Sequence, residues 1–263
     1  MRSLVLLFAL VAAPVSAHEF WLSPESYSVA PGETIRAATR VGDDFSGASY
    51  SWFPRSTEQS FSIQDGARVE TEGRIGDRPA IRIQGVGEGL VVIAHETGDS
   101  TVRYDEWDKF GRFTRHKGFP DAQARHLERG GTEALVVEDY RRFAKSLVAV
   151  GAGEGADAPV GLEVEIVALA NPYTDGAADI PVRVLRGGEA QPGKFVTVFE
   201  KDADGSVTEI ELTTDAEGVA IVPVTPGREY QVDSVFLDEI EPSGSGATWR
   251  TLWANLTFMV PEG

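Results

Sequence analysis

The sequence of 263 residues contains no cysteine, so a disulfide framework and a lipid-modified cysteine are both excluded. Histidine is scarce, with four residues in the whole chain. Basic residues are outnumbered, because 24 Lys and Arg stand against 41 Asp and Glu and give a formal charge of −17. This acidity argues against nucleic acid or an anionic membrane surface as a partner, since both select basic patches.

Long apolar runs are also absent, and the most apolar stretch, Leu4 to Ala13, lies near the start of the chain. It is about half as long as the roughly twenty residues that a membrane-spanning helix needs. Arg2 precedes it and the small residues Ser16 and Ala17 follow it, a pattern typical of a signal peptide. We expect residues 1–17 to be cleaved after Ala17, leaving a periplasmic or secreted protein without membrane insertion that begins at His18.

The rest of the chain consists largely of short segments in which apolar and polar residues alternate, separated by Gly, Pro and Asp turns. This pattern predicts a mainly β protein with two β-sandwich domains of immunoglobulin or transthyretin type. We place the N-terminal sandwich at residues 18–150 and the C-terminal sandwich at residues 162–263. The Gly- and Ala-rich stretch 151–161 is interpreted as the linker between them.

A helical segment is expected within the first sandwich, over about residues 104–148. Aromatic residues recur every three positions from Tyr104 to Phe113, which favours a first helix, and "DAQARHLERG" favours a second. A third helix is predicted from Thr132 onward, because the following apolar residues form an amphipathic stripe: Val136, Val137, Tyr140, Ala144 and Leu147. These helices are expected to cover a sheet.

His18 is the first candidate for a functional residue, because cleavage after Ala17 would make it the N-terminal residue. Its α-amine and its ring Nδ1 can then close a six-membered chelate around one metal ion. Both groups lose their protons close to neutral pH and become neutral donors. Nitrogen ligands of this kind suit Cu(II) or Ni(II). The alternative is that His18 merely follows the cleavage site.

The remaining histidines are His95, His116 and His126, and together they would supply further nitrogen ligands to this site. Each also has a structural explanation. His95 ends an apolar strand, His116 ends a helix where a cation is favourable, and His126 lies on the second helix. Glu19 is the carboxylate candidate next to His18. The predicted metal ligands are therefore His18, Glu19, His95, His116 and His126.

No catalytic motif competes with this hypothesis, because the chain has no nucleophilic cysteine, G-x-S-x-G, H-E-x-x-H or phosphate-binding loop. Two alternatives remain open. The two sandwiches would form a non-enzymatic interaction or adhesion module, with incidental histidines, or the protein would be a copper-dependent redox enzyme. Convergence of the histidines separates the metal hypotheses from the interaction module.

Several segments, in order along nearly the whole mature chain, resemble the bacterial DUF4198 family, a domain of unknown function: "AHEFWLSP", "YRRFAKSLVAVG", "GLEVEIVALANPY", "TTDAEGVAIVPV" and "WRTLWANLTFMV". The stretch "YDEWDKF" and the histidines after it, His116 and His126, are similar to a histidine-bearing subgroup. This family is similar to the substrate-recognition component of nickel and cobalt uptake systems, whose N-terminus binds metal. That component is attached to transmembrane helices, which this chain lacks.

The resemblance therefore implies a soluble periplasmic protein that binds nickel, cobalt or copper as its transition-metal ion. Its role would be uptake, delivery or buffering, with a membrane metal transporter as a partner. We predict no enzymatic activity for it.

Overall fold

The structure is a computed structural model that describes residues 18–71, 73–174, 176 and 178–262. The predicted signal peptide, residues 1–17, lies outside the described residues. The fold is mainly β and of the sandwich type, which confirms the predicted fold class. No helix in the described residues is long and apolar enough to cross a membrane.

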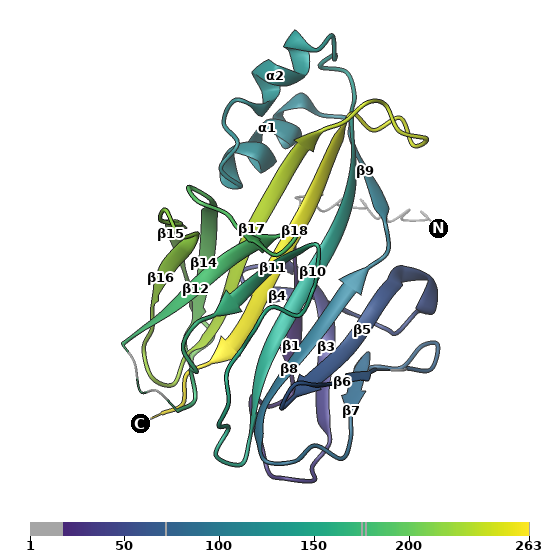
Figure 1. Ribbon diagram of the computed structural model, residues 1–263. Coiled ribbons are helices and arrows are strands. Elements are labelled where there is room, and N and C mark those ends of the chain that lie inside the picture. Colours follow the sequence, from purple (N-terminus) through teal and green to yellow (C-terminus); the bar gives the residue numbers. More distant parts are fainter. Residues whose placement is uncertain (1–17, 72, 175, 177, 263) are drawn as a thin grey trace, which may run out of the picture.

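A ten-stranded sheet runs through the whole molecule (Figure 1). Its main path joins eight strands in the spatial order β15 (Val207–Thr213), β14 (Phe195–Lys201), β17 (Glu229–Glu239), β18 (Trp249–Met259), β10 (Val136–Val150), β8 (Gly89–Thr97), β5 (Thr57–Gln64) and β6 (Ala67–Glu70). The short strands β2 (Ser28–Val29) and β9 (Ser100–Tyr104) also pair with β10.

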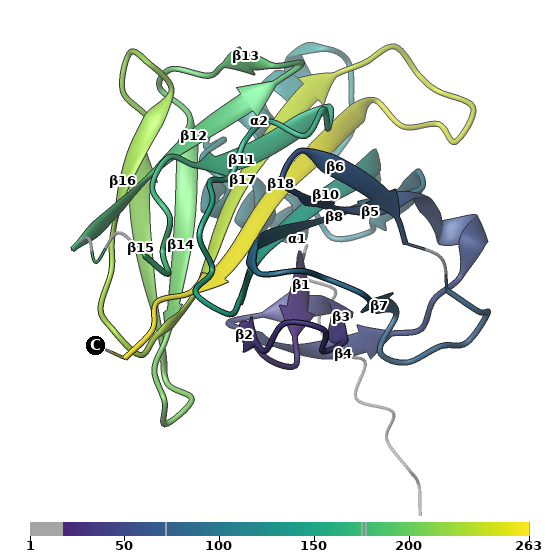
Figure 2. The same ribbon diagram turned by 60° about the horizontal axis from the view of Figure 1, so that its bottom comes forward.

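Two four-stranded sheets cover this central sheet. One contains β1 (Glu19–Pro24), β3 (Ile35–Asp43), β4 (Ser46–Tyr50) and β7 (Ile81–Ile83), and the other contains β11 (Val164–Ala168), β12 (Asp179–Arg186), β13 (Glu189–Ala190) and β16 (Val219–Pro223). Figure 2 shows them on opposite sides of the central sheet. A 3₁₀ turn at Pro54–Ser56 leads into β5.

The alternation of side chains along β8 explains this arrangement. Leu90 and Val92 belong to the core shared with β11 and β12, whereas Val91 and Ile93 belong to the core shared with β1 and β3. Successive side chains of a strand point to opposite faces, so an apolar residue at every position fits a strand covered on both sides. The unbroken apolar run at residues 90–94 thus places β8 in the middle layer.

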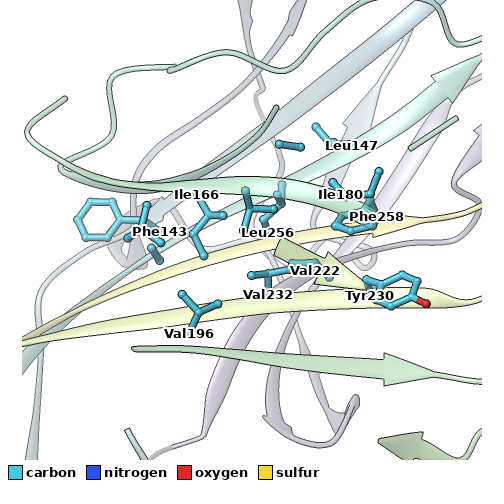
Figure 3. Packing of buried hydrophobic residues seen from close by; sticks show 14 of the residues in the cluster. Phe143, Leu147, Ile166, Ile180, Val196, Val222, Tyr230, Val232, Leu256 and Phe258 are labelled. Atoms are coloured by element: carbon cyan, nitrogen blue, oxygen red, sulfur yellow. The ribbon is translucent and has the colours of Figure 1, made fainter. Parts of the chain in front are cut away.

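The larger core lies between the central sheet and the β11–β12 sheet (Figure 3). Phe143 and Leu147 of β10 enter it beside Leu256 and Phe258 of β18. Each such side chain contributes about 1.5–3 kcal/mol when it is fully buried. Strands from both halves of the sequence therefore share this core.

The predicted helical segment is only partly correct. Helices α1 (Trp107–His116) and α2 (Ala122–Glu128) form as expected, but the predicted third helix is strand β10. The helix-like spacing was misleading because Glu138, Lys145 and Ser146 are polar yet buried, so the alternation of a strand is obscured. Partners within the fold satisfy these polar groups, including Asp157 for Lys145.

Strands on the two sides of the predicted linker pair with each other. Strand β10 pairs in parallel with β18 over nine residues, from Glu138 opposite Trp249 to Ser146 opposite Thr257. Strands from both predicted sandwiches thus belong to the same ten-stranded sheet. The segment 151–161 contains no helix or strand. It is nevertheless held to the body, since the buried Lys145 ammonium lies 2.8 Å from the Asp157 carboxylate.

Helices α1 and α2 pack on β17 and β18 near one end of the central sheet (Figure 1). Phe110 and Phe113 of α1 are buried against Trp249 and Trp253 of β18, with ring centroids 5.8 and 5.7 Å apart, respectively. Such aromatic pairs add about 0.5–1.5 kcal/mol to the energy of burial. The aromatic spacing that predicted α1 therefore marks its contact face.

Candidate functional site

His18 lies immediately before β1, opposite the end of β3. The β1–β3 register pairs Glu19 with Gly42, which brings His18 level with Asp43. The Nδ1 atom of His18 lies 2.8 Å from Oδ2 of Asp43. The two side chains are 32% and 52% exposed, so a solute can reach both.

This contact changes the expected role of the imidazole. The predicted chelate uses Nδ1, and in the structure Nδ1 faces a carboxylate. A carboxylate beside a histidine nitrogen either fixes the ring tautomer or becomes a second ligand on the same ion. Asp43 is therefore part of the site, although it is not among the ligands predicted from the sequence.

The backbone of His18 connects this pair to a cavity inside the molecule. The carbonyl oxygen of His18 accepts a hydrogen bond of 3.3 Å from the guanidinium of Arg142, on β10. Arg142 and Phe20, two residues after His18, both line a cavity of about 220 Å³. The N-terminal pair and the cavity are thus adjacent parts of one region.

The cavity lies between the β1–β3–β4 sheet and strands β8 and β10 of the central sheet. Its walls are rich in aromatic side chains: Phe20, Tyr50, Trp52, Phe53 and Tyr140. The only charged or titratable groups among its lining residues, apart from tyrosines, are His95 and Arg142. No Asp or Glu belongs to the lining.

His95 is a wall of this cavity and is only 4% exposed. Its ring centroid lies 5.6 Å from that of Phe20 and 6.2 Å from that of Trp52. Its Nδ1 atom is buried and has no hydrogen-bond partner among the described residues. Burial lowers the pKa of His95 to about 4, so the ring is neutral at neutral pH.

Arg142 carries the positive charge of the cavity. It forms no ion pair with a carboxylate in the described part of the chain, although its charge lowers the pKa of the buried Glu138, and its Nε atom is buried there without a hydrogen-bond partner. The ring of Tyr140 lies 4.5 Å from its guanidinium carbon and helps to hold it in place. Arg142 could not be identified from the sequence, because nothing in two adjacent arginines, Arg141 and Arg142, distinguishes the one that lines a cavity.

His116 is separate from this region. It ends helix α1, and its Nε2 atom lies 3.1 Å from the Glu209 carboxylate of β15. The side chain is exposed, and a surface pair of this kind contributes little to stability.

His126 is a structural residue, because both of its ring nitrogens are engaged. Trp249 Nε1 donates a hydrogen bond of 3.0 Å to Nδ1, so Nε2 carries the proton that it shares with the Thr132 carbonyl oxygen at 3.2 Å. The ring also packs against Trp107 and Phe110. Burial lowers its pKa, which further favours the neutral ring.

Glu19 is also engaged, in a buried ion pair with Lys117. Within the described residues, no group of three or more His, Cys, Asp or Glu side chains could hold a metal ion. Among these residues, the five predicted ligands thus do not assemble into one shared site. What the structure does bring together is His18 with Asp43, beside the cavity of His95 and Arg142.

The fold and this region define a mainly β, sandwich-type protein with an aromatic-lined cavity next to its first described strand. The chain belongs to the DUF4198 family, described as a domain of unknown function, whose model matches residues 15–234. This confirms the resemblance seen in the sequence. A search of curated proteins gave no match.

Two solved structures give alignments over 92% of the chain. One is a tetra-tandem repeat in the extending region of a large adhesion protein, with 13% identity and a TM-score of 0.22, and the alignment spans 49% of that structure. The other is the D0-D1 domain of intimin, with 12% identity, a TM-score of 0.19 and 97% of that structure covered. At such low TM-scores, these likenesses carry no information about the function of this chain.

Proposed function

We propose that the protein is an exported metal-binding protein that holds one nickel, cobalt or copper ion at an N-terminal His18. The ligands are the α-amine of His18, its ring Nδ1 and the carboxylate of Asp43. Uptake, buffering or delivery of the ion to a membrane transporter is the role that fits such a site. The proposal replaces the four-histidine site with a smaller one.

The observation that carries this proposal is the 2.8 Å distance between Nδ1 of His18 and Oδ2 of Asp43. Metal–nitrogen and metal–oxygen bonds in proteins are about 2.0–2.2 Å long, so two ligands at right angles on one ion lie about 2.8–3.1 Å apart. Square-planar Cu(II) and Ni(II) place neighbouring ligands at such an angle. The pair is therefore spaced as two adjacent ligands of one ion.

The rest of the donor set depends on cleavage after Ala17. Cleavage would release an α-amine on the same residue, and amine and Nδ1 would close a six-membered chelate. Asp43 would then add a negative charge, which offsets part of the charge of the ion. A divalent ion bound to two nitrogens and one oxygen keeps an open position, from which it can be passed to another protein.

The test uses protein that has been exported and processed by its own leader, with the N-terminus verified by mass spectrometry. Calorimetric titration with Ni(II), Co(II) and Cu(II) is expected to show one tight site. One extra alanine before His18 should abolish it, because the amine then belongs to another residue. Asp43→Asn should weaken binding at least tenfold.

Asp44→Asn is the matched control, because it removes the same charge from the next, exposed position of the β3–β4 turn. It should change affinity less than twofold. Equal binding by the wild type and the alanine-extended variant would reject the N-terminal site. Absence of binding in both would leave the interaction module as the function to test.

A further inference from the structure

We propose that the cavity beside the N-terminal pair is a binding site for a small organic carboxylate with a flat, apolar body. The inference goes beyond metal binding and does not depend on it. It rests on the size of the cavity, on its aromatic walls and on two buried nitrogen atoms of its lining residues that have no hydrogen-bond partner among the described residues.

The size of the cavity fits a small molecule. Its volume of about 220 Å³ lies just below the range of about 300–1,000 Å³ that is typical of sites for drug-sized ligands. Phe20 and Trp52 are buried in its wall, whereas Tyr50 and Phe53 are large aromatic side chains that remain about half exposed. Aromatic walls bind flat apolar groups well, by stacked or edge-to-face contacts.

The unpartnered polar atoms indicate what the ligand should carry. Nε of Arg142 and Nδ1 of His95 are both buried without a hydrogen-bond partner among the described residues, and both residues line the cavity. Most buried polar groups in proteins are hydrogen-bonded, and leaving one unsatisfied costs about 1–3 kcal/mol. Two such groups at one cavity point to a ligand that satisfies them.

The charge at the cavity favours an anion. Arg142 forms no ion pair within the described chain, although its charge lowers the pKa of the buried Glu138, and the cavity lining contains no acidic residue that would repel an anion. A guanidinium forms paired hydrogen bonds with a carboxylate, and a neutral His95 can add one further N–H donor. A cationic ligand or a metal ion would instead be repelled by the positive charge of Arg142.

The guanidinium of Arg142 is also preorganised for such a ligand. The His18 carbonyl oxygen accepts a hydrogen bond from Arg142 on one side, and the Tyr140 ring lies against the guanidinium. A donor that is fixed in advance loses less freedom when a ligand binds. Because the protein as a whole is strongly acidic, selectivity for an anion must come from these local contacts.

The test uses benzoate as the probe and benzamide as its uncharged analogue of nearly the same shape. Binding to the full processed chain is measured by calorimetry and by saturation-transfer NMR, with EDTA present so that metal binding plays no part. Benzoate is expected to bind saturably at one site, and benzamide at least tenfold more weakly. Equal binding of the two probes, or no binding of benzoate, would overturn the proposal.

Two substitutions locate the site. Arg142→Gln should weaken benzoate binding at least tenfold and leave benzamide binding unchanged. Arg183→Gln is the matched control, because Arg183 on β12 also has a buried Nε without a partner in the described residues but does not line the cavity. It should leave both affinities within twofold of the wild type.

A third variant tests the same cavity in case Arg142→Gln does not fold. Trp52→Leu removes an aromatic wall without changing the charge, and it should weaken both probes together. Unchanged benzoate binding in Arg142→Gln or in Trp52→Leu would place the probe elsewhere on the surface and reject this cavity as the site. Thermal unfolding curves show which variants are folded before either affinity is compared.

Discussion

Lys117, at the end of helix α1, donates a hydrogen bond of 2.5 Å to Glu19, the residue that follows His18. The same ammonium lies 3.2 Å from Asp233 of β17, and all three side chains are almost completely buried. Burial alone lowers the pKa of Lys117, but the charges of Asp233 and Glu19 outweigh this effect and raise it. Lys117 is therefore charged and anchors the first strand to the centre of the fold.

The first prediction is that Lys117→Met destabilises the protein by about 3–5 kcal/mol. The substitution leaves two carboxylates buried without their counter-charge, which is far more costly than losing a surface pair. The measurement is the free energy of unfolding in urea at pH 7. Lys109→Met is the control on the same helix, because its partners Glu106 and Asp105 are exposed, and it should change little.

The pKa of Glu19 depends on the same buried charges. Burial raises the pKa of Glu19. The charge of Lys117 lowers it, but the negative charge of Asp233, which contacts the same ammonium group, raises it again, so the pKa stays above its usual value. Lowering the pH should therefore make Lys117→Met less damaging, since a carboxyl group can then be neutral. If the cost of the substitution were the same at pH 5 and pH 8, the buried charges would not be its cause.

The second prediction concerns His95 and acid. Its pKa falls from 6.5 to about 4 on folding because the ring is buried, so the folded state favours the neutral form. The corresponding stability is present above pH 6.5 and is lost as the pH falls toward 4, by about 3 kcal/mol in total. We expect His95→Phe to lack this loss. Parallel urea titrations at pH 7 and pH 4 would detect it.

The comparison with the wild type is what isolates His95, since other groups also titrate between pH 7 and pH 4. A His95→Phe protein that loses as much stability as the wild type would show that His95 is hydrated in the folded state. His116→Phe serves as the control, because that side chain is exposed and pairs only at the surface.

The third prediction concerns Glu138, a buried carboxyl group on β10. It accepts hydrogen bonds from Thr251 and, at 2.9 Å, from Tyr104. Burial outweighs these bonds and raises its pKa to about 7. A raised pKa means that the folded state favours the protonated form, so this stability is full below about pH 4.5 and is lost as the pH rises through 7.

Glu138→Gln should therefore gain up to about 3 kcal/mol relative to the wild type between pH 4.5 and pH 8. The effect is opposite in sign to that of His95 over nearly the same interval, so the two partly cancel in the wild type. Unfolding curves of the variant at pH 4.5 and pH 8 provide the measurement. A variant that is equally destabilised at both values would indicate a packing defect instead.

The strand-rich character of the chain was predictable from its short segments between Gly, Pro and Asp turns, such as Leu90 to Ala94, whose unbroken apolar run suits a strand that is covered on both faces. The opposite error at β10 has a clear cause. Val136, Tyr140, Ala144 and Leu147 fall at helical spacing, and the strand pattern is hidden because Glu138 and Lys145 are buried polar residues. Whether a polar residue is buried depends on distant partners, which local sequence does not reveal.

The pairing of strands was equally hidden. Nothing near Glu138 predicts that it lies opposite Trp249 in the same sheet, and the local sequence favours a linker at the Gly-rich segment between the two halves. In the candidate site, His18 could be predicted from the sequence, because a histidine follows the expected cleavage site. Its partner Asp43 follows only from the β1–β3 register, and Arg142 only from the packing of two sheets.

The central place of β18 has a consequence for how the chain acquires its fold. Thr251 on this strand bonds to Glu138, 113 residues earlier, and contacts between such distant positions form slowly. Until β18 arrives, most of one edge of β10 is left unpaired, and open edges of this kind promote aggregation. The first half of the given sequence alone thus lacks the partner of β10, and the central sheet of the described residues is complete only when β18 has paired with it.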